Sequence, residues 1–82
     1  MRFTIYSKPG CTFCDQAKAL LEARSMVYEE LILDVGQEKD SEKTYVPVAT
    51  LKERMPTART VPQIFNGDTY VGGYTELRQL LN

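Results

Sequence analysis

Two cysteines, three positions apart, are the residues of this chain with the clearest capacity for chemistry. They lie in the segment Lys8-Pro9-Gly10-Cys11-Thr12-Phe13-Cys14, between an apolar run and a segment with helical periodicity. A thiol at a helix N-terminus faces unpaired backbone N–H groups and the positive end of the helix dipole, which favour the thiolate. The second thiol lies one turn later on the same face, within disulfide distance of the first. The pair is therefore typical of thiol–disulfide exchange.

The composition excludes several other kinds of site. The chain of 82 residues contains no histidine and no third cysteine. Neither a Cys–His nucleophile pair nor a four-ligand zinc site within one chain can therefore form, and we expect no metal ligand. The pair is left with redox chemistry, a metal shared between two chains, or a plain structural role.

Charge and hydropathy indicate an ordinary globular protein. The net charge is −1, so no basic excess points to nucleic acid or to an anionic membrane. No apolar run approaches the roughly 18 residues that a membrane span needs. The apolar run at the start of the chain is too short, and its residues are too polar, for a signal peptide. We expect a single domain over residues 1–82, a monomer located in the cytoplasm.

Hydrophobic periodicity predicts the elements that must position the two thiols. Alternating residues predict strands, a repeat of three to four predicts helices, and Asn66-Gly67 between two β-type runs is a strong hairpin signal. Pro47 fits only in the first turn of its helix. The expected elements are strands at 2–6 and 27–33, helices at 12–24 and 44–55, hairpin strands at 61–65 and 69–72, and a short helix after Gly73 containing Leu77, Leu80 and Leu81.

This order of elements, β-α-β-α-β-β-α, predicts an α/β fold. The first two strand–helix units imply a parallel crossover, and the hairpin adds an antiparallel pair. We therefore expect a four-stranded mixed sheet with helices on both faces. A redox Cys-x-x-Cys after the first strand is a known companion of such a pattern.

Three separated segments give the chain a resemblance to the glutaredoxin family, whose members have the thioredoxin fold. They are Tyr6–Cys14 with the cysteine pair, Arg59–Phe65 with Thr-Val-Pro, and Gly72–Leu77 with Gly-Gly. The resemblance covers nearly all of the chain, and the combination is far more specific than the cysteine pair alone. It implies a glutathione-dependent dithiol oxidoreductase that reduces protein disulfides and glutathione mixed disulfides, with a four-stranded sheet flanked by three helices.

The resemblance also implies roles for particular residues. Cys11 is then the nucleophile and Cys14 the resolving thiol. A cis peptide bond between Val61 and Pro62 would leave the backbone of Val61 free to pair with an extended thiol peptide. The residues that match or adjoin the family's glutathione-binding positions are Lys8, Phe13, Arg59, Thr60, Val61, Pro62, Gly73, Tyr74 and Thr75.

The chain departs from the family's usual pattern in two places. Thr12 and Phe13 replace the Pro and Tyr that most often separate the cysteines, so the ring is kept and the phenol hydroxyl is lost. Thr75 stands where members usually carry an Asp that binds the γ-glutamyl ammonium of glutathione, and Glu76 is the next residue.

Two alternative functions use the same thiols. In one, a flavoprotein thioredoxin reductase supplies the electrons and ribonucleotide reductase receives them. In the other, two chains each contribute Cys11 and a bound glutathione to one [2Fe–2S] cluster. The leading interpretation has glutathione as co-substrate and disulfide-bearing or glutathionylated proteins as partners, ribonucleotide reductase being one candidate.

Overall fold

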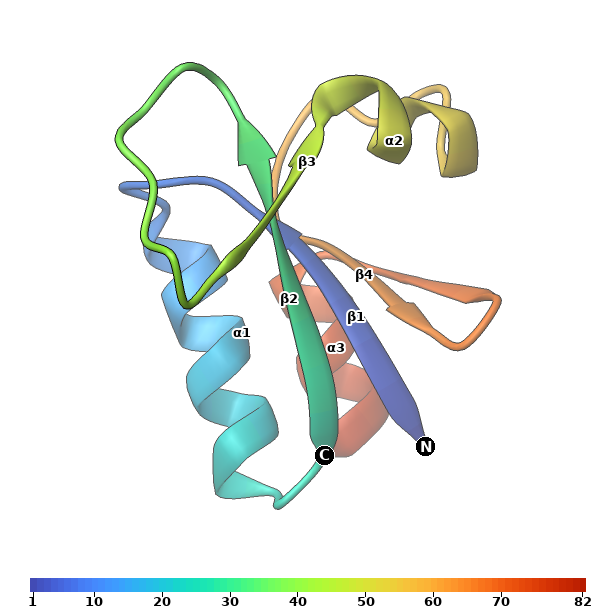
Figure 1. Ribbon diagram of the computed structural model, residues 1–82. Helices are drawn as coiled ribbons and strands as arrows, with labels where there is room; N and C mark the ends of the chain where they lie inside the picture. The colour runs from blue at the N-terminus through green and yellow to red at the C-terminus, as the bar shows by residue number, and fades with distance from the viewer.

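The computed structural model describes residues 1–82, which form five strands and three helices. In chain order these are β1 (Arg2–Ser7), α1 (Thr12–Ala23), β2 (Val27–Asp34), β3 (Thr44–Pro47), α2 (Val48–Arg54), β4 (Gln63–Asn66), β5 (Thr69–Gly72) and α3 (Tyr74–Leu81). The strands form one sheet in the order β3-β2-β1-β4-β5 (Figure 1). β1 pairs in parallel with β2 and antiparallel with β4, so the sheet is mixed, as predicted. None of the three helices has the length and apolar character that a membrane crossing requires.

Alternation along β1 explains why helices cover both faces of the sheet. Successive side chains of a strand point to opposite faces. Phe3 and Ile5 are fully buried on the face covered by α1 and α3. Tyr6 points to the other face, where it belongs to a second buried cluster that includes Leu51 of α2. Figure 1 shows α2 at the end of the sheet where β2 ends, which is also the end at which α1 begins.

The sheet has five strands where the sequence predicted four. We expected one helix over residues 44–55, but β3 pairs in parallel with β2, with Tyr45 opposite Ile32 and Val46 opposite Leu33. Val46 also packs against the second buried cluster. Because strand pairing and burial outweigh local helical periodicity here, the helix begins only at Val48.

The first strand of the hairpin begins two residues later than predicted. β4 starts at Gln63, whereas the sequence placed the strand start at Val61. Pro62 has no N–H group to donate to a strand ladder, so the residues before Gln63 stay outside the sheet. The Val61–Pro62 peptide bond is cis, as expected.

Candidate active site

Cys11 lies at the junction between β1 and α1, where it caps the helix. Its backbone is extended, with φ −97° and ψ 103°, and Thr12 is the first helical residue. The backbone amide of Cys14 donates a hydrogen bond to Cys11 Sγ over 3.1 Å. This bond satisfies one of the N–H groups that every helix N-terminus leaves unpaired. Thr12 therefore belongs to the first turn of α1 and is not its cap.

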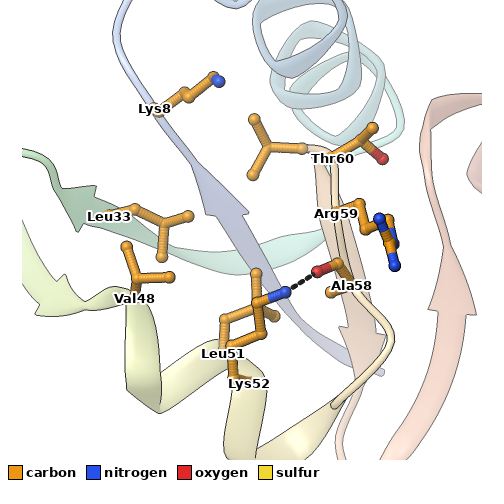
Figure 2. A pocket seen from close by; sticks show the side chains of 9 residues that line it. Lys8, Leu33, Val48, Leu51, Lys52, Ala58, Arg59 and Thr60 are labelled. Atoms are coloured by element: carbon orange, nitrogen blue, oxygen red, sulfur yellow. Dashed lines mark hydrogen bonds between the residues drawn. The ribbon is translucent and has the colours of Figure 1, made fainter.

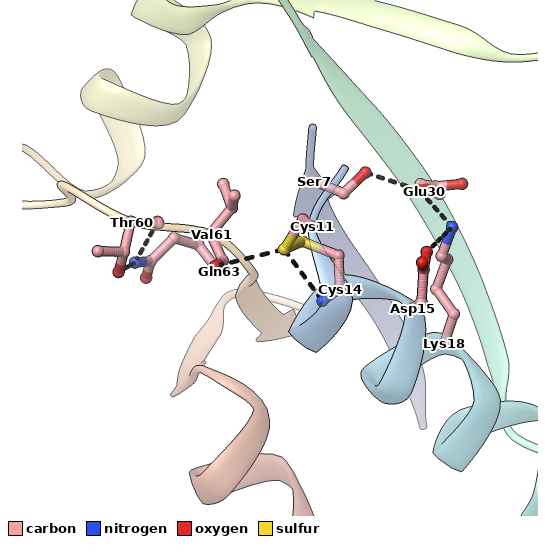
Figure 3. Close-up of a disulfide and its surroundings, with 9 residues drawn as sticks. All are labelled: Ser7, Cys11, Cys14, Asp15, Lys18, Glu30, Thr60, Val61 and Gln63. Atoms are coloured by element: carbon pink, nitrogen blue, oxygen red, sulfur yellow. Dashed lines mark hydrogen bonds and ion pairs between the residues drawn. A yellow bond between two sulfur atoms is a disulfide. The ribbon is translucent and has the colours of Figure 1, made fainter. Parts of the chain in front are cut away.

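The two cysteines form a disulfide and differ in accessibility. Their Cα atoms lie 5.2 Å apart (Figure 3). Cys14 is only 1% exposed, whereas Cys11 is partly buried and keeps an accessible edge. An incoming disulfide can therefore reach the sulfur of Cys11 more readily than that of Cys14.

The chain just before β4 contacts the reactive end of α1. Cys11 Sγ lies 3.7 Å from the carbonyl oxygen of Val61 (Figure 3). The amide of Val61 donates no hydrogen bond within the chain. Val61 thus presents a free backbone donor beside the disulfide, which an extended peptide could use.

An open groove, here called the aromatic groove, runs from the start of α1 to the start of α3. Its lining residues are Phe13, Thr60, Val61, Pro62, Gly73, Tyr74, Thr75 and Glu76. Phe13 is 59% exposed, and its ring centroid lies 6.0 Å from that of Tyr74 at an interplanar angle of 30°. The groove brings together seven of the nine residues that the sequence singled out beside the cysteines.

Lys8 and Arg59, the other two, lie in a neighbouring hollow that we call the basic groove (Figure 2). Its lining residues are Lys8, Leu33, Val48, Leu51, Lys52, Ala58, Arg59, Thr60 and Val61. Thr60 and Val61 line both grooves, so the two meet at Val61, whose carbonyl oxygen lies 3.7 Å from Cys11 Sγ. Lys8 and Arg59 take part in no salt bridge of the chain.

Glu76 lies in the aromatic groove, although the sequence did not place it among the binding residues. Its Oε1 accepts a hydrogen bond from the amide of Gly73 over 2.7 Å. Gly73 is the N-cap of α3, so Glu76 holds the position three residues on from which a glutamate reaches back to a helix start. The three-residue spacing between Gly73 and Glu76 is the sequence signal that could have predicted this position of Glu76. The carboxylate places a negative charge at this end of the groove.

A cluster of charged residues ties α1 to the strands next to the active site (Figure 3). Glu30 Oε2 accepts a hydrogen bond from the buried Ser7 hydroxyl over 2.6 Å and pairs with Lys18 Nζ at 2.9 Å. Burial alone would raise the pKa of Glu30, but the bonds from Ser7 and Lys18 outweigh it and lower that pKa. Burial likewise opposes the charge of Lys18, but Glu30 and Asp15 raise its pKa overall.

Comparison with known proteins identifies the family. The family model for glutaredoxin matches residues 3–71. The chain belongs to the glutaredoxin family. A glutaredoxin of Neisseria meningitidis serogroup A is 36% identical over 78 residues, which make up 94% of this chain and 81% of that protein.

Two further comparisons extend this result. A hybrid peroxiredoxin, hyPrx5, of Haemophilus influenzae is 37% identical over 76 residues, and this chain spans 27% of that longer protein. Among solved structures, a buckwheat glutaredoxin–glutathione complex superimposes with a TM-score of 0.65 at 26% identity, over 94% of this chain and 64% of that one. The expected thioredoxin-like fold is confirmed, with a fifth strand added.

Membership of the glutaredoxin family and the Cys11–Cys14 disulfide together make this chain a thiol–disulfide oxidoreductase. The redox-active pair predicted from the sequence is the pair that forms the disulfide. The grooves share Thr60 and Val61, and the carbonyl oxygen of Val61 lies 3.7 Å from the sulfur of Cys11.

Proposed function

We propose that this glutaredoxin reduces protein disulfides and glutathione mixed disulfides with glutathione as its reductant. The observation that carries the proposal is the position of Cys11. Cys11 is partly exposed and its sulfur lies 3.7 Å from the carbonyl of Val61, which lines both grooves and has a free backbone donor, while Cys14 is 1% exposed. We assign Cys11 as the nucleophile and Cys14 as the resolving thiol.

The reaction transfers two electrons from the dithiol to a substrate disulfide. The Cys11 thiolate attacks one substrate sulfur in line with the S–S bond, and the other sulfur leaves as a thiolate that takes up a proton. Cys14 then loses its proton and attacks Cys11, which forms the Cys11–Cys14 bond and releases the second substrate thiol. Two glutathione thiols reduce this disulfide again and leave as one molecule of glutathione disulfide.

The backbone and charges of the site support the binding of glutathione in one direction. The free amide and the carbonyl of Val61 would pair with the cysteine of glutathione as an added antiparallel strand. The cations of Lys8 and Arg59 would then face the glycine carboxylate. At the other end, the γ-glutamyl group would lie at the start of α3, where Thr75 and the carboxylate of Glu76 line the groove.

Glu76 takes the place of the missing Asp in this proposal. One of its oxygens caps the Gly73 amide, and its negative charge is available to the γ-glutamyl ammonium. The substitution Glu76→Gln tests this sharply, because an amide oxygen can still accept the Gly73 hydrogen bond while the charge is lost. We expect the KM for glutathione to rise by about threefold, as for the loss of one exposed ion pair.

The decisive experiment measures which reductant supports turnover. Hydroxyethyl disulfide is reduced in the presence of either glutathione with glutathione reductase and NADPH, or thioredoxin reductase with NADPH. We expect turnover with glutathione, and a raised KM in Glu76→Gln. Glu53→Gln, which changes an exposed carboxylate outside both grooves, is the matched control and keeps the wild-type KM. Turnover with thioredoxin reductase alone would replace this proposal by the reductase-linked alternative.

A further inference from the structure

We propose that the basic groove is the docking surface for an acidic segment of a protein substrate, one that follows the reactive cysteine and contains an apolar side chain. This inference rests on the proposed function, because it uses the direction of chain pairing given above for glutathione. It concerns a longer chain after the substrate cysteine, whereas glutathione has only its glycine there.

The floor of the basic groove is apolar. Leu33, Leu51 and Ala58 are nearly fully buried beneath it, and Val48 at the start of α2 remains 39% exposed. An apolar side chain of a partner could pack against this exposed valine, and the apolar surface buried in that contact would stabilise the complex. No local pattern in the sequence predicts this surface, because its floor joins residues of β2, α2 and the loop before β4.

The rim of the basic groove carries only positive charge. Lys8, Lys52 and Arg59 line it, and no carboxylate does (Figure 2). The chain as a whole has 11 acidic and 10 basic residues, so three cations around one hollow are a local departure from its balance. Lys52 donates a hydrogen bond to the carbonyl of Ala58, which holds its charge at the groove. Charge complementarity therefore favours an acidic partner.

The geometry beside Cys11 decides which part of a substrate reaches this groove. In an antiparallel pair, residues that follow on one strand lie opposite residues that precede on the other. A substrate cysteine opposite Val61 would therefore place its following residues over Thr60 and Arg59. These residues line the basic groove, so the chain after the cysteine enters it.

The test uses symmetric peptide disulfides and protein that has been reduced beforehand, so that no glutathione is present. After the cysteine, one peptide carries leucine and two glutamates, a second leucine and two lysines, and a third serine and two glutamates. We expect the first peptide to react with Cys11 about tenfold faster than the second at low ionic strength. The difference should shrink in about 1 M salt, which screens exposed charges. The serine peptide should react about threefold more slowly than the leucine peptide.

Two variants connect these preferences with the groove. Lys52→Gln should reduce the preference for glutamate about twofold, and Val48→Ser should reduce the preference for leucine about twofold. Rates are expressed as ratios to hydroxyethyl disulfide, so that a loss of folded protein cancels. Lys39→Gln and Val35→Ser remove a lysine and an exposed valine outside both grooves, and both preferences should persist in these controls.

Equal rates for the three peptides, or preferences that survive both groove variants, would overturn the proposal. This test is independent of the proposed reductant. If glutathione does not support turnover, the peptide preferences can still be observed, because the peptide reaction needs only the protein dithiol. Loss of turnover with glutathione alongside intact peptide preferences would therefore refute the proposed reductant and leave the docking surface supported.

Discussion

The backbone amide of Cys14 donates a hydrogen bond to the sulfur of Cys11 over 3.1 Å. This is a helix N-cap interaction in which sulfur takes the place of the usual side-chain oxygen. The sulfur that caps α1 is thus also the sulfur that exchanges. When the disulfide is reduced, the same amide and the helix dipole favour the negative charge on Cys11.

The first prediction separates the two cysteines. Cys11→Ser should abolish every exchange reaction, because no accessible thiolate remains. Cys14→Ser should keep the reduction of glutathione mixed disulfides, because a second glutathione can release Cys11, while the reduction of protein disulfides falls. Both activities are measured with the purified variants. In the reduced wild type, iodoacetamide should modify Cys11 first, and faster alkylation of Cys14 would contradict the assignment.

The second prediction concerns the contacts of Glu30 with Ser7 and Lys18. The folded state lowers the pKa of Glu30, so its contribution to stability is present above the ordinary glutamate pKa of about 4.3 and is lost as the pH falls. The folded state raises the pKa of Lys18, so that contribution is present below the ordinary lysine pKa of about 10.4 and is lost as the pH rises through the folded value.

Glu30→Gln should therefore lower the free energy of unfolding by about 1–2 kcal/mol at pH 7. It should also flatten the loss of stability between about pH 5 and pH 3. Urea unfolding at several pH values measures both effects. Glu29→Gln changes the adjacent glutamate, which is exposed and takes part in no salt bridge. An equal loss in both variants would show that the cluster around Glu30 has no special role.

Local signals in the sequence were sufficient for the parts of the fold that local chemistry controls. The cysteine pair marked the start of α1, and Asn66-Gly67 marked the turn between β4 and β5. The residues of the aromatic groove followed from the family resemblance, with the exception of Glu76. Each of these features depends on a few neighbouring residues or on a motif that the family shares.

The parts that could not be predicted depend on residues far apart in the chain. β3 forms because Tyr45 and Val46 pair with Ile32 and Leu33, and no pattern within residues 44–55 reports that pairing. The basic groove joins residues of β2, α2 and the loop before β4, and the contact between Ser7 and Glu30 joins residues 23 positions apart. Hydrophobic periodicity alone therefore favoured a longer helix over the strand that the sheet requires.

The third prediction concerns the glycine that ends β5. Gly72 has φ +127°, and a Cβ there would lie 2.7 Å from Cγ of Glu76. Gly72→Ala combines an unfavourable backbone conformation with a clash, so we expect a loss of about 2–4 kcal/mol in the free energy of unfolding. Gly67 also has a positive φ, +59°, but open space around it. Gly67→Ala should cost only about 1 kcal/mol, and equal losses in chemical denaturation would contradict the proposed clash.

The fourth prediction tests the residue that replaces the family's usual proline. Thr12 is the first residue of α1, where proline is well tolerated because the N–H it lacks has no helical partner. Proline also restricts the residue before it to extended conformations, and Cys11 already has φ −97° and ψ 103°. Thr12→Pro should therefore keep the fold and raise the free energy of unfolding by about 0.4–1 kcal/mol, because it restricts the unfolded chain.

Urea unfolding of the oxidised variant against the oxidised wild type measures the change in the free energy of unfolding. Thr57→Pro, at an exposed position outside the helices and strands, serves as a second site. A loss of more than about 1 kcal/mol in Thr12→Pro alone would show that the Thr12 side chain or amide stabilises the start of α1.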